Sequence, residues 1–411
     1  MKLPQHVSPV AIALALVAAP AFASGNVHVV GPVAGPGVDF TNLQSAVDAA
    51  AADDLILVES GSYAGFTVQS KPLTITADLG ASIDISGTVR VELLDAGEVV
   101  VLSGLDVDAN GAGTALWLES NVGPVHVERC TFIGTGLPIF IPGHAVQLAS
   151  CDSTTFTDCT IQATTAGSSD AGVLSQSSDI RLYESVCVGA SGLSSANGGA
   201  GCRVIGGTLF ASGTTFTGGT GGAGGVSGPF MICSDGGPGG TGLSLENNLF
   251  TGDPDGTILD CSFNGGAGGA PGGPECSTGP AGTGLDVQAG PLTTIQVPAR
   301  TYEVTSPIRS GEPATLSFHG AENEFVFLLV SSTQTPFYTG LFKGVWHPAT
   351  PYFLVFVGNI PASGDLDVVT TVNLDPSLQC AVLHEQPLYY QLSTEWTLGA
   401  PRPSVILANS F

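Results

Sequence analysis

The sequence predicts an all-β protein: a right-handed parallel β-helix, or solenoid, followed by a β-sandwich-like domain. A strand that starts small-Gly-apolar-x-apolar recurs along the chain, with its first apolar residue at Leu116, Val146, Val173, Cys202, Leu243 and Leu285. The first three steps between these positions are 30, 27 and 29 residues, and the segments lack the 3.6-residue period of helices. A coil of this length cannot bury its inward side chains alone, so we expect stacked coils that share one core.

A second short strand follows each of these strands and ends in an apolar or aromatic residue. In a solenoid, equivalent inward residues stack from coil to coil at the strand spacing of about 4.8 Å. One predicted row contains the six positions named above, and another contains Phe132, Ile161, Val188, Phe216 and Phe263. The later, longer steps contain glycine-rich insertions at 218–240 and 265–284, and the repeats predict about eight coils.

The N-terminus has the features of a secretory signal peptide, which we place at residues 1–23. Lys2 supplies a positive charge, an apolar run follows at 10–19, and Ala21-Phe22-Ala23 fits a small-x-small cleavage site. The run is too short to span a bilayer, and no other segment approaches the roughly 20 apolar residues that a membrane helix needs. The sequence therefore predicts a protein that is secreted or located at the cell surface, without a membrane span.

The β-helix is predicted to occupy residues 24–304 and to begin with a short helix. Residues 39–50 place Phe40, Leu43 and Val47 at helical spacing. A helix in this position would cover the open end of the solenoid, where strand edges have to be hidden.

The segment 39–78, DFTNLQSAVDAAAADDLILVESGSYAGFTVQSKPLTITAD, resembles the entry segment of right-handed β-helix proteins of the pectin-lyase-like superfamily. Extended by the repeats, this resemblance covers roughly residues 26–303. It implies a fold without implying an activity, because the superfamily includes lyases, hydrolases, adhesins and proteins of no known activity.

Residues 305–411 are predicted to form the β-sandwich-like domain. The long glycine runs stop there, aromatic content rises, and strands are expected at 325–332, 352–359, 365–373, 388–394 and 404–411. The phrases GNIPASGDLDV, NLDPSLQC and ILANSF resemble a C-terminal module that is common in secreted proteins of planctomycete-type bacteria.

The net charge of the chain limits the classes of molecule that the protein is expected to bind. The chain has 10 Lys and Arg against 35 Asp and Glu, a net charge of −25. Such a chain repels polyanions, so nucleic acid and anionic membrane surfaces are poor partners. The same field disfavours polyuronates unless Ca²⁺ bridges the two. The partner we expect is a polysaccharide or a cell-surface glycan.

Catalytic patterns are sparse. A lyase of this fold needs Lys or Arg to remove a proton beside a carboxyl group, and a hydrolase needs clustered carboxylates. The only His-Gly pair, His319-Gly320, lies in the other domain, and the basic residues of the mature β-helix are scattered at Lys71, Arg90, Arg129, Arg181, Arg203 and Arg300. We predict a non-catalytic scaffold that binds glycans or acts as an adhesin. The alternative is a polysaccharide lyase or glycoside hydrolase.

Four residues make up the predicted substrate-binding set: Trp117, Arg181, Tyr183 and Arg203. Each alternates with core positions along its strand, so each should point outward. An exposed aromatic ring stacks on a sugar; the alternative is that it packs beneath a loop.

Asp106, Asp108 and Asn110 precede Gly111 at alternate positions, as oxygen ligands do at the start of a Ca²⁺ loop. The alternative is a plain turn, because Asp, Asn and Gly favour turns for backbone reasons. Ca²⁺ is therefore the one cofactor that the sequence brings into consideration.

The nine cysteines are an odd number, so at least one is unpaired or bonded to another chain. Cys233 and Cys276 occupy corresponding places in the two glycine-rich insertions, and we predict that they form a disulfide. Cys130 and Cys159 fall in one row, where they are either buried thiols or a bridge between coils.

Overall fold

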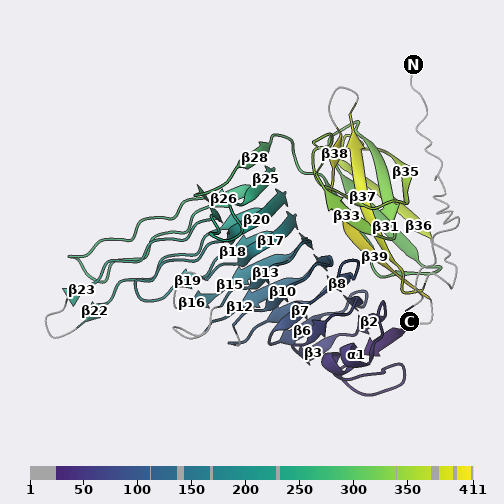
Figure 1. Ribbon diagram of the computed structural model, residues 1–411, viewed down its shortest axis with the longest axis horizontal. Helices are drawn as coiled ribbons and strands as arrows, with labels where there is room; N and C mark the ends of the chain where they lie inside the picture. The colour runs from purple at the N-terminus through teal and green to yellow at the C-terminus, as the bar shows by residue number, and fades with distance from the viewer. Residues whose placement is uncertain are drawn as a thin grey trace.

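The computed structural model describes residues 25–111, 113–136, 143–166, 170–227, 232–338, 340–371, 379–391, 396–408 and 411. The predicted signal peptide lies outside these residues. The described chain forms the predicted parallel β-helix, and a β-sandwich packs against its side (Figure 1).

The coils of the β-helix contribute strands to three faces. The docked face, which the sandwich covers, contains β1 (Val27–Val30), β2 (Leu55–Val58), β5 (Leu73–Ala77), β8 (Val100–Ser103), β11 (Val125–Glu128), β14 (Thr154–Thr157), the second halves of β17 (Val173–Tyr183) and β20 (Cys202–Ser212), β25 (Asp255–Leu259) and β28 (Leu292–Ile295). The middle face contains β3 (Gly61–Ala64), β6 (Ile83–Ser86), β9 (Asp106–Asp108), β12 (Thr131–Gly134), β15 (Thr160–Ala163), β18 (Val186–Val188), β21 (Thr215–Thr217) and β26 (Ser262–Asn264). The open face contains β4 (Thr67–Gln69), β7 (Val89–Glu92), β10 (Leu116–Glu119), β13 (Val146–Ala149), the first halves of β17 and β20, β24 (Leu243–Glu246) and β27 (Leu285–Val287). The eight-stranded middle face confirms the expected number of coils.

The predicted row on the open face is confirmed at every step. Its residues pair in parallel register from strand to strand, in the order Leu116, Val146, Val173, Cys202, Leu243 and Leu285. Most of these side chains are fully buried in one continuous core, as stacked coils require.

One residue of the other predicted row is wrong. The observed row runs through Phe132, Ile161, Cys187, Phe216 and Phe263, so Cys187 replaces Val188. Cys187 is fully buried, whereas its neighbour Val186 is 40% exposed. The error is a slip of one position, which in a strand exchanges the inward and outward faces.

A column of left-handed residues turns the chain between the docked and middle faces. The column contains Gly104, Arg129, Asp158, Glu184, Gly213 and Asp260, all with φ between 49° and 72°. The amide of each of the first four binds the carbonyl of the strand in the next coil. Arg129, Asp158 and Glu184 therefore stack along one corner of the solenoid, where their side chains can meet the second domain.

The capping helix is present as α1 (Leu43–Ala49). The Asn42 side chain accepts a hydrogen bond from the Ser45 amide, as an N-cap does. Leu43, Ala46 and Val47 are buried in the solenoid core. The helix thus covers the N-terminal end of the solenoid.

The connections from the middle face to the open face lengthen along the solenoid and form a projecting plate (Figure 1). We call this plate the glycine blade; it consists of segments 189–192, 196–201, 218–225, 234–242, 264–273 and 277–284. The short pairs β16 (Thr165–Ala166) with β19 (Ser191–Gly192), and β22 (Val226–Ser227) with β23 (Ile232–Cys233), lie at its base and tip.

Backbone hydrogen bonds, rather than apolar side chains, hold the blade together. Within one layer, the Gly218 amide donates to the Asn264 carbonyl, and Gly221 donates to Ala267 three residues later. Between layers, the Gly240 amide donates to the Gly219 carbonyl. This three-residue period is that of polyproline II chains, arranged here in two layers of three segments.

Only glycine fits at the inner positions of the blade. A methyl group on Gly219, Gly240 or Gly266 would lie within 2 Å of a carbonyl oxygen of a neighbouring segment. In segments 218–225 and 264–273, the third residue of each Gly-Gly-x triplet, such as Thr220 or Ala223, is exposed. The predicted disulfide between Cys233 and Cys276 is confirmed, and it joins two segments near the blade tip. Cys130 and Cys159 are buried free thiols.

The second domain is a sandwich of two sheets around an apolar core. One sheet contains β29 (Thr301–Val304), β31 (Pro313–His319) and β36 (Asp365–Thr371). The other contains β30 (Ile308–Arg309), β39 (Arg402–Leu407), β37 (Val382–Tyr390), β32 (Phe325–Ser331) and β35 (Tyr352–Asn359), with β38 (Thr397–Leu398) on β37, and a hairpin of β33 (Gln334–Phe337) and β34 (Trp346–Pro348) lies beside it. Strand β29 pairs with β31, so Thr301–Val304 belongs to a sheet of the sandwich.

The sandwich docks through β39 and β37 onto the docked face. Leu55 and Leu57 of β2 pack against Val405 and Leu407 of β39. The Thr157 hydroxyl donates to the Pro401 carbonyl at 3.2 Å. Outward side chains in the middle of the docked face, such as Thr76, His126 and Phe210, are therefore interior residues of the two-domain protein.

Candidate functional site

Trp117 and Arg203, two of the four predicted binding residues, share one outward row of the open face. Trp117 pairs with Arg90 on one side and Gln147 on the other, and the row continues through Leu174 to Arg203. Three strand spacings separate the two residues, which is roughly 14 Å. The second domain packs on a different face; within this row Trp117, Gln147 and Arg203 are half-buried and Leu174 is buried.

Trp117 lies beneath Arg90, whose guanidinium carbon is 4.8 Å from the indole centroid. Arg90 Nη2 also lies 3.4 Å from Glu119 and 3.7 Å from Glu92. Both Arg90 Nε and Trp117 Nε1 are inaccessible to solvent and have no hydrogen-bond partner among the described residues. Buried donors are nearly always paired, so two adjacent unpaired N–H groups are the unusual feature of this face.

Arg203 forms a two-pronged ion pair with Glu246. Its Nε and Nη2 atoms donate to the two carboxylate oxygens at 2.8 and 2.7 Å. Burial alone would raise the pKa of Glu246, but Arg203 holds it below the ordinary value. Arg203 is therefore already engaged, with its side chain 40% exposed.

The open face continues without a break into one layer of the blade. Segments 196–201, 234–242 and 277–284 lead directly into β20, β24 and β27. The Gly201 amide donates to Thr241, and the Gly242 amide donates to Thr283, so these segments keep the order of the strands. The resulting surface carries small side chains, which leaves it accessible to an extended ligand.

The structure corrects the expected exposure of Arg181 and Tyr183. Both point outward from β17, as predicted, but on the docked face beneath the second domain. Tyr183 is 2% exposed, and its hydroxyl lies 2.9 Å from His347 Nε2. Arg181 donates to the Ser153 hydroxyl at 3.1 Å. A sugar cannot reach Tyr183 while the domains are docked, so these two residues are not part of the open-face row.

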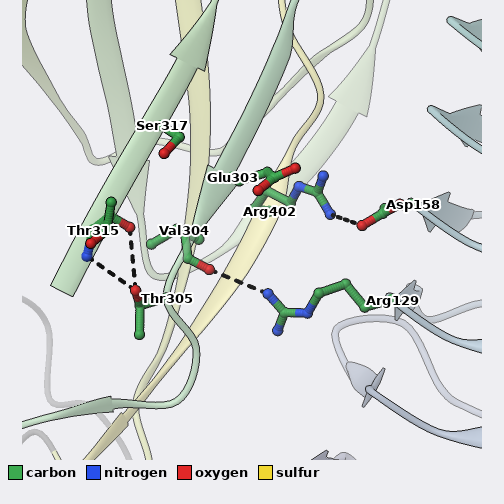
Figure 2. A pocket seen from close by; sticks show the side chains of 8 residues that line it. All are labelled: Arg129, Asp158, Glu303, Val304, Thr305, Thr315, Ser317 and Arg402. Atoms are coloured by element: carbon green, nitrogen blue, oxygen red, sulfur yellow. Dashed lines mark hydrogen bonds and ion pairs between the residues drawn. The ribbon is translucent and has the colours of Figure 1, made fainter. Parts of the chain in front are cut away.

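A cavity of about 260 Å³ lies at the junction of the two domains. Figure 2 shows the side chains that line it, with Arg129 and Asp158 from the solenoid corner facing β29, β31 and β39. Arg129 donates to the Val304 carbonyl at 3.2 Å. Acidic and basic groups do converge here, as they would in an active site.

Arg402 accounts for most of that convergence. It is 1% exposed and donates to the Tyr302 carbonyl, to Glu128 at 3.3 Å and to Glu184 at 2.9 Å. Burial raises the pKa of Glu184 to about 7, although Arg402 opposes this. Because every contact crosses or supports the domain junction, Arg402 acts as a clamp between the domains.

Three histidines are buried in the same junction: His126 from the solenoid, and His347 and His384 from the sandwich. Gln334 bridges His126 and His384. Burial lowers the pKa of His384 to about 4, and it also lowers the pKa values of His126 and His347. All three are therefore neutral at neutral pH. No local pattern in the sequence predicts this cluster, because its members lie in separate strands and Gln334 is 208 residues from His126.

The predicted Ca²⁺ residues lie on an extended strand and the turn that follows it. Asp106 and Asp108 are exposed ends of β9, and the Asp108 carboxylate accepts a hydrogen bond from the Asn110 amide at 2.8 Å. Asn110 has φ 48°, and its side chain donates to Ser86. Within the described residues, no group of three or more His, Cys, Asp or Glu has a metal-binding arrangement. Calcium binding here remains a prediction.

No protein-family model matches this chain, and no curated protein matches it. Among solved structures, the chain is similar to the receptor-binding protein of bacteriophage Det7, a podoviral tailspike in a myovirus. The identity is 9% and the TM-score 0.17, over 92% of this chain and 97% of that chain. A likeness this slight carries no argument, so fold and function rest on the residues themselves. No helix in the described part of the chain has the length and hydropathy of a membrane span.

Proposed function

We propose that this protein is a secreted or cell-surface, non-catalytic β-helix scaffold that binds a polysaccharide or cell-surface glycan along its open face. The observation that carries the proposal is the pair of unpartnered donors, Arg90 Nε and Trp117 Nε1, beside an aromatic ring. Both donors are closed to solvent while the Arg90 guanidinium covers the indole, so a sugar reaches them only when the Arg90 side chain moves aside. The sugar hydroxyl oxygens then accept the hydrogen bonds while the sugar ring stacks on the indole.

The charges of the open face favour a neutral glycan. Glu92 and Glu119 flank the Arg90–Trp117 pair, and Glu246 neutralises Arg203. The acidic net charge of the chain adds to this field. A polyanionic glycan would be repelled, whereas a neutral one is indifferent to the field.

The test is retention on a panel of neutral polysaccharides, measured by affinity gel electrophoresis. We expect Trp117→Ala to weaken retention at least tenfold, since both stacking and a hydrogen bond are lost. Trp117→Phe keeps an aromatic ring without the N–H and should fall between the two. The matched control is Val186→Ala, which trims an outward side chain of the middle face. Equal retention of Trp117→Ala and wild type would refute the proposal.

The second candidate is a polysaccharide-cleaving enzyme that acts at the domain junction. The cavity beside Arg129 and Asp158, and the raised pKa of Glu184, favour it. The contacts of Arg129 and Arg402 favour docking instead, because both arginines already bind protein groups. Release of reducing or unsaturated ends from any polysaccharide of the panel, abolished in Asp158→Asn, would establish the enzyme.

We also propose, from the entry segment and the coil repeat, that the solenoid belongs to the pectin-lyase-like superfamily. Helix α1 and the first coil occupy the segment that carries the resemblance. We likewise propose that the sandwich is a C-terminal module of the kind that is common in secreted proteins of planctomycete-type bacteria.

We propose Asp106, Asp108 and Asn110 as a Ca²⁺ site. The melting temperature tests this site, because a chelator should lower it if the ion is bound.

A further inference from the structure

Strand β35 is an edge strand whose outer side has no partner in the described chain. It ends the sheet β30-β39-β37-β32-β35 and pairs only with β32. Its side chains are exposed on both faces of the sheet: Tyr352 by 41%, Phe353 by 41% and Leu354 by 54%. Proteins normally protect such an edge with charges, prolines or a covering segment.

The absence of charge around β35 is unusual for this chain. The 21 residues from Gly344 to Gly364 include no Asp, Glu, Lys or Arg. The neighbouring edge strand, β36, is the contrast, because it carries the exposed Asp365 and Asp367. The edge strand β36 is thus protected in the usual way, whereas β35 is left apolar, and the backbone groups of its outer side have no strand partner among the described residues.

We propose that β35 pairs antiparallel with β35 of a second copy, so that two chains form a dimer through their sandwich domains. An antiparallel pair of identical strands has twofold symmetry, and each strand offers the other the same unpaired edge. Two copies that each carry a net charge of −25 repel one another. An uncharged segment is therefore the surface at which they can approach most easily.

The apolar area at this edge is sufficient for a stable dimer. Six side chains around β35 are 41% to 54% exposed: Phe337, Tyr338, Tyr352, Phe353, Leu354 and Phe356. At roughly 100 Å² each, they provide about 600 Å² per copy, or about 1,200 Å² in total, which reaches the range of specific interfaces. A sugar-binding platform would use one face of the strand, whereas strand pairing uses both faces and the backbone edge.

The test is sedimentation equilibrium of the full mature chain at micromolar concentration. We expect wild type to have twice the monomer mass. Leu354→Lys and Phe353→Lys place a charge on opposite faces of the edge, and each should weaken dimerisation at least 100-fold. The matched control is Val369→Lys, which adds the same charge to an exposed position of β36 and should leave the dimer intact.

The melting temperature of each variant, measured where all are monomeric, separates loss of pairing from loss of folding. Leu354→Ser, which adds no charge, should weaken the dimer less than Leu354→Lys. A monomeric wild type overturns the proposal, and so does a Leu354→Lys protein that remains dimeric. A monomer whose retention on polysaccharide depends on Leu354 and Phe356 would instead identify a stacking platform.

Discussion

The glycine blade makes a sharp prediction because its interior contains only backbone. In Gly240→Ala, the new methyl carbon would lie 1.9 Å from the Gly199 carbonyl oxygen. The closest ordinary contact between a carbon and a carbonyl oxygen is about 3.3 Å. The two segments must therefore separate by about 1.4 Å, which is more than a tightly hydrogen-bonded layer absorbs.

The cost follows from the bonds that such a separation disrupts. Gly240 donates to Gly219 at 2.7 Å, Gly266 donates to Gly240 at 2.8 Å, and Gly219 donates to Gly199 at 2.8 Å. At about 1 kcal/mol net for each bond, the substitution lowers the free energy of opening the blade by about 3 kcal/mol. The solenoid core contains none of these residues, so its own stability should change little.

Hydrogen exchange reads the local stability directly. We expect the blade amides of Gly240→Ala to exchange about 100-fold faster than those of wild type, since about 1.4 kcal/mol is a factor of ten. Exchange in the solenoid strands should be unaffected. The control is Gly225→Ala in the same blade, where a methyl group meets nothing within 4 Å. Exchange within twofold of wild type in Gly240→Ala, or equal damage in Gly225→Ala, would refute the reasoning.

Three further substitutions probe the junction and the blade tip. Arg402→Met removes the cation that binds Glu184 and leaves Glu128 with Arg129 alone, so denaturant unfolding at neutral pH should show a loss of about 3 kcal/mol; a loss below 1 kcal/mol would contradict the clamp. Burial lowers the folded pKa of His384 to about 4, so its contribution to stability is complete above about pH 6.5 and is lost as pH falls towards 4. That loss is about 3 kcal/mol, and His384→Gln should remove it from the pH profile of stability. Cys233→Ala opens a loop with a sequence separation of 43 residues, which should cost about 4 kcal/mol in the blade and make its tip the first site of proteolysis.

The rows of the solenoid were predictable because a coil repeat carries its register in its spacing. Leu116 and most of its equivalents begin an alternation that continues with polar residues such as Gln147, Arg203, Ser244 and Asp286, so one register is favoured. The same reasoning failed at Val188, because in Val186-Cys187-Val188 both registers are apolar. A strand of three residues does not contain enough alternation to choose between them.

The coil repeat could not predict that the second domain covers Arg181 and Tyr183. Alternation gives the direction of a side chain, but not what lies beyond it. Whether an outward residue meets water or another domain depends on how β39 and β37 dock, a contact between residues more than 200 positions apart.

Two further features are predictable from the sequence: the position of Arg90 beside Trp117, and the three-residue period of the glycine blade. Arg90 stands 27 residues before Trp117, one coil period, so the spacing that aligned the core row also aligns these two outward residues. The insertions read GGTGGAGG and GGAGGAPGG, a local three-residue period. That period predicts polyproline II segments, whereas composition averaged over the whole chain obscures it.

The two proposals together make a prediction that neither makes alone. Figure 1 places β35 on the side of the sandwich away from the blade, so pairing through β35 leaves the open faces of both copies uncovered. A dimer then has two glycan-binding faces, and a polymer that reaches both is held more tightly than an oligosaccharide that reaches one. Leu354→Lys should therefore weaken retention on a long polysaccharide at least tenfold while leaving the affinity for its oligosaccharide unchanged. Trp117→Ala should weaken both, because it alters the face itself. If Leu354→Lys reduced oligosaccharide affinity as well, the edge strand would belong to the binding site, and the separation of roles argued here would be wrong.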